Sequence, residues 1–290
     1  MDRQSNVAHN ASMSLIVAVI GPGRLGCDVG LTFARSGDQV LLVGRSLEHA
    51  DAAWQIRTRE LEDRAPSELS EAICRIRPAS QEEAMDRADL VFEALPEDLE
   101  IKQEAWMALE AQASPSAMFL TGSSALPRSL VAARMQAPER LSNFHPFCPI
   151  HRSRVVEVCA AQSEQEHVRS LARRLGLRVV EVPERVGFLA SRMALAMGLE
   201  AMRLLEGGHT SAEDLDRLMV QGYGLPVGPL ELSDRVGLDV RLAIADALFA
   251  STNESRWAAP ELLRNLVLAG HLGRKSQRGF YSWPRTGATQ

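Results

Sequence analysis

Residues 15–26 of the chain read LIVAVIGPGRLG, and this stretch decides the fold. Its first half is a short, unbroken apolar run, which is typical of a parallel strand covered on both faces. The glycine-rich turn that follows leads into a segment where Leu25, Val29 and Phe33 recur at the spacing of one helix face. A second apolar run, Val40–Val43, comes next. The pattern predicts a βαβ unit of about 30 residues.

The same alternation of short apolar runs and helical patterns continues along most of the chain. A polar, helical region is predicted over Leu47–Glu71, interrupted by Pro66. Further strands are predicted at Ile73–Ile76, Leu90–Ala94, Met118–Leu120, Val155–Cys159 and Arg178–Val182, with helices at Leu99–Ala113 and Gln165–Leu175. Strands that alternate with helices indicate an α/β fold, and we predict a doubly wound, mostly parallel Rossmann sheet.

The character of the sequence changes at Gly187. Phe188–Glu206 carries apolar residues on two faces of one helix, which is typical of a helix buried at a domain or subunit interface. Ser211–Val220 and Leu238–Ala250 are further helical patterns, and no strand pattern follows Gly187. We therefore predict a disordered extension over residues 1–12, a Rossmann domain over residues 13–186 and an all-α C-terminal domain over residues 187–290.

Composition and charge exclude several classes of function. The 290 residues carry a formal net charge of −5, without the basic excess of a nucleic-acid-binding surface, so no nucleic-acid partner is expected. The four cysteines form no Cys-x-x-Cys pair and no zinc-like spacing with histidine. We expect no metal site, no disulfide, and a reducing, cytoplasmic compartment. The apolar run before Gly21 is too short for a signal sequence or a membrane span, so no membrane association is expected.

The turn Gly21-x-Gly23-x-x-Gly26 has the chemistry of a dinucleotide site. We expect one glycine to permit the tight turn, the next to admit a pyrophosphate close to the backbone, and the third to let helix and strand pack closely. The helix that begins at Arg24 and Leu25 would point its N-terminus at the anion, so both residues are candidate cofactor contacts. The alternative is a glycine-rich turn without a ligand. The position of the glycine turn between a buried strand and a helix favours an NAD(P) site.

The end of the second apolar run bears on the choice of cofactor. NAD enzymes commonly carry Asp or Glu there to bond the ribose 2′-hydroxyl, but this chain reads Gly44-Arg45-Ser46. The Arg45 guanidinium and the Ser46 hydroxyl suit a 2′-phosphate, which favours NADP over NAD. The alternative is that Ser46 caps the next helix and Arg45 is solvated, in which case NAD is the cofactor.

Several motifs occur in order along residues 15–283 and point to one family. They are Ala88–Leu99 (ADLVFEALPEDL) with Lys102, Ser123-Ser124, Pro138-Glu139-Arg140 before His145, Val156-Glu157-Val158, Gly187-Phe188, Gly228–Leu232 (GPLEL), Val236–Asp239 (VGLD), Leu272–Lys275 (LGRK) and Arg278–Tyr281 (RGFY). On these residues the chain resembles the 3-hydroxyacyl-CoA dehydrogenase family, with its 3-hydroxybutyryl-CoA dehydrogenase and lambda-crystallin relatives. The resemblance implies an NAD(P)-dependent oxidoreductase of fatty acid metabolism.

His145 is the candidate catalytic acid or base. Hydride transfer from an alcohol needs a group that takes the hydroxyl proton, and imidazole exchanges protons near neutral pH. Glu157 is the candidate that orients the ring and stabilises imidazolium. The resemblance implies this pair, a serine at Ser124 that bonds the substrate oxygen, and Glu97 and Lys102 near the nicotinamide ribose. Taken singly, these residues also fit a core histidine, an exposed strand acid, a helix cap and a surface ion pair.

Two departures from the family pattern fall among the candidate site residues. The family has an asparagine near the cofactor amide where this chain has Cys148, and an asparagine that helps to bind the substrate carbonyl where this chain has Ser191. Serine offers one donor in place of an amide, and losing a donor of this kind costs on the order of 100-fold in rate. We therefore expect slower turnover of ordinary acyl-CoA substrates, or a different substrate.

The sequence leads to one main functional hypothesis and two alternatives. The main hypothesis is hydride transfer between NADP(H) or NAD(H) and a 3-hydroxyacyl or 3-oxoacyl thioester, carried on CoA or on an acyl carrier protein. The alternatives are an L-3-hydroxyacid or sugar-acid dehydrogenase that acts on a free acid, and a catalytically weak dinucleotide-binding homologue. The doubly apolar helix over Phe188–Glu206 and the resemblance both favour a homodimer.

Overall fold

The computed structural model describes residues 14–62 and 69–283. The chain divides into two compact units, of which the first ends at Glu184 and the second begins at Arg185. The extension predicted over residues 1–12 and the break predicted at Pro66 lie outside the described residues.

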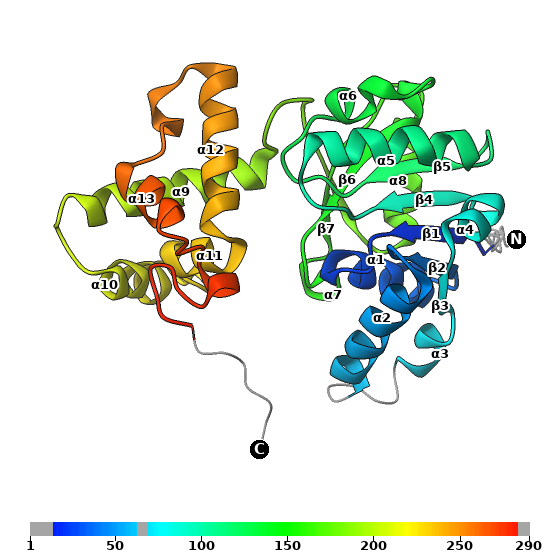
Figure 1. Ribbon diagram of the computed structural model, residues 1–290, viewed down its shortest axis with the longest axis horizontal. Coiled ribbons are helices and arrows are strands. Elements are labelled where there is room, and N and C mark those ends of the chain that lie inside the picture. Colours follow the sequence, from blue (N-terminus) through cyan, green and yellow to red (C-terminus); the bar gives the residue numbers. More distant parts are fainter. Residues whose placement is uncertain (1–13, 63–68, 284–290) are drawn as a thin grey trace, which may run out of the picture. The chain divides into compact units, whose positions relative to one another are not determined.

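The first unit is built on an eight-stranded sheet with the strand order β3-β2-β1-β4-β5-β6-β7-β8 (Figure 1). Neighbouring strands run parallel except β6 and β7, which are antiparallel. The strands are β1 (Ile16–Ile20), β2 (Gln39–Val43), β3 (Ile76–Ala79), β4 (Leu90–Glu93), β5 (Met118–Thr121), β6 (Leu141–Pro146), β7 (Val155–Cys159) and β8 (Arg178–Glu181). The predicted doubly wound, mostly parallel sheet is thus confirmed.

Alternate residues of β1 enter two different cores, which explains the unbroken apolar sequence of this strand. Val17 and Val19 belong to one hydrophobic cluster, and Ala18 and Ile20 belong to another. The helices that accompany the sheet are α1 (Arg24–Arg35), α2 (Leu47–Glu62), α3 (Ser70–Ile73), α4 (Gln81–Arg87), α5 (Leu99–Gln112), α6 (Arg128–Val131), α7 (Ile150–Ser153) and α8 (Gln165–Arg174), with 3-10 turns η1 (Ala132–Arg134) and η2 (Pro138–Arg140). The glycine turn therefore follows a strand that is packed on both faces.

The sheet differs from the sequence prediction in two places. The strand predicted over Ile73–Ile76 is wrong, because Ile73 is the last residue of α3 and Ile76 is the first residue of β3. The strand β6 was not predicted, since Ser142 and Asn143 interrupt its apolar pattern although both are buried. This unpredicted strand carries His145.

The regular elements of the second unit are helices throughout its described part, residues 185–283, as the sequence predicted. They are α9 (Leu189–Glu206), α10 (Ala212–Arg217), η3 (Leu218–Gly222), α11 (Pro229–Val236), α12 (Leu238–Thr252), η4 (Ser255–Trp257), α13 (Glu261–Leu268) and η5 (Arg274–Ser276). Leu195 and Leu199 of α9 are fully buried in the core of this unit, whereas Met193 is 73% exposed. Within the described parts of the chain, no helix combines the length and apolar character needed to cross a lipid bilayer.

Candidate active site

The glycine turn between β1 and α1 leaves one side open. Gly21 has a φ of +106°, and a Cβ on it would lie 2.6 Å from the Ala94 carbonyl oxygen, so only glycine fits. A Cβ on Gly26 would lie 1.9 Å from the Gly21 carbonyl oxygen, because α1 packs directly on the turn. A Cβ on Gly23 would meet no described atom within 4 Å. The turn is therefore open at Gly23, the residue that precedes α1. The first N–H groups of this helix have no partners within the helix.

A cavity of about 660 Å³ opens at this turn and extends along the end of β2 and one side of α5. Five residues predicted to bind the cofactor line it: Gly21, Gly23, Arg24, Leu25 and Arg45. The first turn of α1 contains no acidic residue, so the positive end of its helix dipole is not neutralised there. This arrangement fits a dinucleotide cofactor whose pyrophosphate meets the helix N-terminus. The other predicted cofactor residues are not part of the lining: Gly26, Ser46, Glu97, Lys102 and Cys148.

The end of β2 has no room for the carboxylate that NAD-binding sites commonly carry there. A Cβ on Gly44 would lie 2.8 Å from His49 Nδ1. The Ser46 hydroxyl accepts a hydrogen bond from the His49 N–H (3.2 Å) and so caps the first turn of α2. Hydrogen bonds from its own backbone and from Ser46 lower the pKa of the Glu48 carboxyl. The structure therefore shows Ser46 as a cap, while Arg45 is exposed to solvent and lines the cavity.

His145 and Glu157 are register partners on the antiparallel strands β6 and β7. Directly opposed residues point to the same face of a sheet, and His145 Nδ1 lies 2.9 Å from Glu157 Oε2. The imidazole is 13% exposed and the carboxylate 3% exposed. The Phe147 ring packs on the imidazole with the two centroids 4.7 Å apart. A buried carboxylate at Nδ1 favours the tautomer protonated at that nitrogen, and this arrangement can support proton transfer at the other ring nitrogen.

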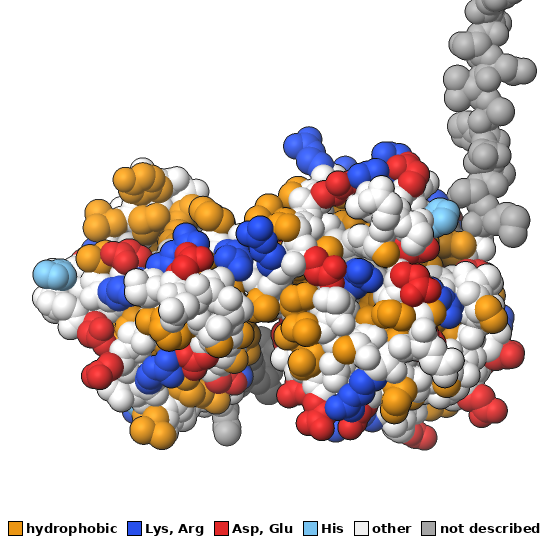
Figure 2. All heavy atoms as spheres, turned by 90° about the horizontal axis from the view of Figure 1, so that it is seen from above, with side chains coloured by type: hydrophobic (Ala, Val, Ile, Leu, Met, Phe, Trp, Pro, Cys, Tyr) orange, Lys and Arg blue, Asp and Glu red, His pale blue; other side chains and the backbone are white. Residues whose placement is uncertain are grey.

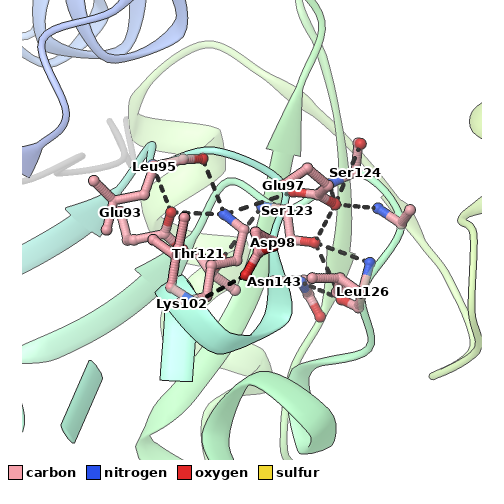
Figure 3. Close-up of polar contacts among 12 residues, drawn as sticks. Glu93, Leu95, Glu97, Asp98, Lys102, Thr121, Ser123, Ser124, Leu126 and Asn143 are labelled. Carbon is pink, nitrogen blue, oxygen red and sulfur yellow. Dashed lines mark hydrogen bonds and ion pairs between the residues drawn. The ribbon is translucent and has the colours of Figure 1, made fainter. Parts of the chain in front are cut away.

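Glu97 follows β4, and one of its carboxylate oxygens collects the hydrogen bonds of the loop after β5 (Figure 3). Glu97 Oε1 accepts from the Ser123 hydroxyl (2.7 Å), the Ser124 N–H (2.9 Å) and the Ala125 N–H (2.8 Å). The Ser124 hydroxyl lies 3.4 Å from the same oxygen. Ser124, which was predicted to bond the substrate oxygen, is therefore held by Glu97, which was predicted to lie near the cofactor.

Lys102 is enclosed by protein oxygens. Its side chain is 1% exposed, and its ammonium lies 2.7 Å from Glu93 Oε1 and 3.5 Å from Glu97 Oε2. It also donates to the Leu95 carbonyl oxygen at 3.3 Å. The alternative of a surface ion pair is therefore wrong for Lys102, because its side chain is buried against Glu93, whereas the Glu97 side chain is 25% exposed.

The two residues that depart from the family pattern lie in different units. Cys148 is exposed as a residue, but protein atoms partly desolvate its thiol and raise the pKa of that thiol to about 12, and the Asp28 carboxylate on α1 adds to the rise. Asp28 itself is 5% exposed and lies 2.5 Å from an Arg57 guanidinium nitrogen on α2. Cys148 is therefore a neutral thiol at ordinary pH. Ser191 is in the first turn of α9 in the second unit, and its contribution to the site stays a prediction.

Glu93 and Thr121 lie next to the Ser124 loop and were not predicted as site residues from the sequence. Each is the last residue of its strand and is fully buried. Glu93 lies within the strand predicted over Leu90–Ala94, and Thr121 follows the strand predicted over Met118–Leu120. Thr121 Oγ1 donates to Glu93 Oε2 at 2.6 Å. A usable signal was present, because polar residues at the carboxyl ends of neighbouring parallel strands meet at the edge where α/β sheets bind ligands.

Comparison with known proteins identifies the family of the chain. Residues 16–186 match the 3-hydroxyacyl-CoA dehydrogenase NAD binding domain, and residues 187–283 match the 3-hydroxyacyl-CoA dehydrogenase C-terminal domain. The chain is 33% identical over 290 residues to a 3-hydroxybutyryl-CoA dehydrogenase of Mycobacterium tuberculosis, covering 92% of this chain and 98% of that protein. It is 32% identical to a probable 3-hydroxybutyryl-CoA dehydrogenase of Bacillus subtilis, covering 92% and 96% of the two chains.

Solved structures agree with these sequence matches. The crystal structure of FadB2 from M. tuberculosis has a TM-score of 0.86 at 30% identity and covers 93% of this chain and 100% of that one. The structure of (S)-3-hydroxybutyryl-CoA dehydrogenase PaaH1 from Ralstonia eutropha has a TM-score of 0.84 at 25% identity, with coverage of 94% and 100%. The two domain matches together extend over residues 16–283. The chain therefore belongs to the 3-hydroxyacyl-CoA dehydrogenase family and is an oxidoreductase of that type.

Proposed function

We propose that the chain transfers hydride between a nicotinamide dinucleotide and a 3-hydroxyacyl-CoA or 3-oxoacyl-CoA thioester, with His145 and Glu157 as an acid–base pair. The observation that carries the proposal is the 2.9 Å contact between His145 Nδ1 and Glu157 Oε2 on the sheet that bears the glycine turn. A protein that only binds a dinucleotide has no need of such a pair. The thioester is supported by relatives named 3-hydroxybutyryl-CoA and 3-hydroxyadipyl-CoA dehydrogenases.

The side chains divide the proton chemistry between them. Bound nicotinamide would supply or accept the hydride at C3 of the acyl chain. His145 would exchange the proton of the C3 oxygen at Nε2, because Nδ1 is directed at Glu157. The buried Glu157 carboxylate would stabilise the imidazolium that forms when His145 acts as a base. The Ser124 hydroxyl would donate to the same oxygen and stabilise the negative charge that develops there during reduction.

The cofactor preference we propose is NADP(H) over NAD(H). Gly44 provides no carboxylate at the end of β2, and Arg45 lines the cavity there. A guanidinium attracts a 2′-phosphate, whereas a carboxylate in this place would repel it. The matching family domain is described as NAD binding, so the preference for NADP(H) rests on Gly44 and Arg45 of this chain alone. We expect a higher kcat/KM with NADPH than with NADH. Equal or better use of NADH would contradict the preference without touching the dehydrogenase assignment.

Cofactor oxidation with a thioester and with the corresponding free acid tests the proposed activity. We expect turnover of acetoacetyl-CoA, and His145→Ala should abolish kcat while leaving cofactor affinity nearly unchanged. His151→Ala on α7 is the matched control, because this histidine is exposed. Turnover of acetoacetate alone would instead indicate a hydroxyacid dehydrogenase. Cofactor binding without turnover of either compound would contradict the proposal, and acetoacetyl carrier protein distinguishes the two possible thioester carriers.

A further inference from the structure

A second cavity lies in the first unit, apart from the glycine turn. It has a volume of about 260 Å³ and is lined by residues from the end of α1, from α7 and the residue after it, and from the end of α8. The helices α1 and α7 lie side by side (Figure 1). No residue that lines this cavity also lines the one at the glycine turn. The two cavities are therefore separate.

Three guanidinium groups line this second cavity, those of Arg35, Arg154 and Arg174. Its lining, within the part of the chain that the structure describes, contains no acidic residue. Arg174 is paired, because it donates to both oxygens of the buried Asp38 carboxylate at 2.9 and 2.8 Å. The exposed side chains of Arg35 and Arg154 make no hydrogen bond or ion pair with any described residue. Two cations without a counter-charge therefore line one small cavity.

The backbone of Arg154 has a conformation that favours glycine. Its φ is +47° and its ψ is +30°, in the left-handed region, where a residue with a Cβ is less stable than glycine. Two hydrogen bonds hold this backbone, from the Arg154 N–H to the Ile150 carbonyl oxygen (3.0 Å) and from the Arg178 N–H to the Arg154 carbonyl oxygen (2.8 Å). Backbone strain that a fold retains is typical of functional sites. The strain therefore points to a role for the Arg154 side chain.

We propose that this cavity binds a small phosphate-bearing anion through Arg35, Arg154 and Arg174. The planar guanidinium group matches the geometry of phosphate oxygens and makes paired, charge-assisted hydrogen bonds to them. Like charges around one cavity repel each other, and a bound dianion relieves this repulsion. The cavity is smaller than the roughly 300 to 1,000 Å³ typical of sites for larger ligands, so it suits inorganic phosphate or a small phosphate monoester. The proposal is independent of the proposed dehydrogenase activity.

Helix ends alone do not account for this arrangement. Arg35 and Arg174 lie in the last turns of α1 and α8, where a cation stabilises the helix dipole. Arg154 follows α7, which has four residues and hence only a small dipole. A role at helix ends therefore explains neither the strained backbone of Arg154 nor the meeting of all three side chains at one cavity.

Isothermal titration calorimetry with inorganic phosphate, in a buffer without other phosphates, tests the proposal. We expect saturable binding to the wild-type protein. Arg35→Gln should raise the Kd for phosphate by at least about 10-fold, because it removes a charge-assisted contact. Arg152→Gln is the matched control, since this exposed arginine belongs to α7 but does not line the cavity. It should change the Kd by less than about 2-fold.

A second variant, Arg154→Gly, separates binding from folding. It removes the guanidinium and at the same time relieves the left-handed backbone. We therefore expect the Kd for phosphate to rise by at least about 10-fold, while the thermal midpoint measured without phosphate does not fall. A lower midpoint together with an unchanged Kd would give Arg154 a structural role only and overturn the proposal.

Binding at another place also overturns the proposal. If Arg45→Gln weakens phosphate binding and Arg35→Gln does not, the anion occupies the cavity at the glycine turn. If Arg152→Gln weakens binding as much as Arg35→Gln, the anion responds to the general potential of the surface rather than to a site. Absence of saturable binding would exclude the site. Glycerol 3-phosphate distinguishes the two sources of the anion, because tighter binding than that of inorganic phosphate supports an ester and weaker binding supports free phosphate.

Discussion

The acid–base pair shows how much depends on single side chains. Glu157→Gln preserves the size of the side chain but removes the charge that stabilises imidazolium and selects the tautomer. We expect kcat to fall by about 10²- to 10⁴-fold, with the cofactor dissociation constant unchanged. Steady-state kinetics and cofactor fluorescence titration measure the two quantities. Glu139→Gln, at an exposed position, is the control. A kcat of Glu157→Gln equal to that of the wild type would exclude an orienting role for Glu157.

Two glycines of the turn should respond differently to the same added methyl group. Gly26→Ala would place a Cβ 1.9 Å from a backbone oxygen, so we expect loss of both stability and cofactor binding. Gly23→Ala meets no described atom within 4 Å, so we expect a thermal midpoint close to that of the wild type and weaker cofactor binding. Thermal unfolding with and without cofactor checks both. Unaltered cofactor affinity in Gly23→Ala would remove Gly23 from the binding site.

Cys27 on α1 should make the first unit sensitive to alkaline pH. Burial raises the pKa of its thiol from 9.0 to about 11. A raised folded-state pKa contributes stability that is complete below pH 9 and is lost as the pH rises through about 11. The loss amounts to at most about 3 kcal/mol in the free energy of unfolding. Urea unfolding at pH 8 to 11 should show this slope reduced in Cys27→Ala but kept in Cys74→Ala, where the thiol is exposed.

At the scale of elements, one carboxylate joins the C-terminal segment to α11. Asp234 is 1% exposed and accepts from the Phe280 N–H (3.0 Å), the Tyr281 N–H (2.9 Å) and the Trp283 indole N–H (2.8 Å). A Cβ on Gly279 would lie 2.0 Å from Asp234 Oδ1, so the segment packs directly on the acid. The motif RGFY near the C-terminus therefore has a structural role in this unit.

Asp234→Ala should destabilise the second unit. It leaves three donors without their acceptor, which we expect to cost about 2 to 4 kcal/mol in the free energy of unfolding. Asp246→Ala is the control, because its ion pair with Arg264 is on the surface and such pairs contribute about 0 to 1 kcal/mol. Chemical denaturation followed by tryptophan fluorescence measures both variants. An equal loss in the free energy of unfolding for Asp234→Ala and Asp246→Ala would show that the buried contacts of Asp234 add no stability.

At the scale of the whole molecule, we propose a homodimer that forms through the helical unit. Figure 2 shows apolar side chains on the surface of this unit. The exposed apolar residues of the unit include Met193 (73%), Tyr223 (80%) and Leu268 (89%). Apolar side chains that form a contiguous patch are typical of a surface that a second copy covers. We expect sedimentation at twice the mass of the chain at micromolar concentration, and Met193→Glu should shift the protein toward the monomer. A monomeric wild type would contradict the dimer.

The sequence by itself determined the features that depend on local periodicity and backbone conformation. The unbroken run of β1, the glycine turn, and the change to helices after Gly187 follow from which residues tolerate burial, tight turns or helical spacing within a few positions. The family resemblance named His145 and Glu157 without showing how far apart they lie.

Only the tertiary structure decided which distant residues meet. β6 escaped prediction because its buried polar residues conceal the strand pattern, yet its antiparallel pairing with β7 brings His145 and Glu157 within 2.9 Å. In the sequence Lys102 also fitted a surface ion pair, and its burial depends on the carboxylate at the end of β4. The physical reason is the same in both cases. Strand order and register determine these contacts, and they follow from packing over the whole unit rather than from the spacing of neighbouring residues.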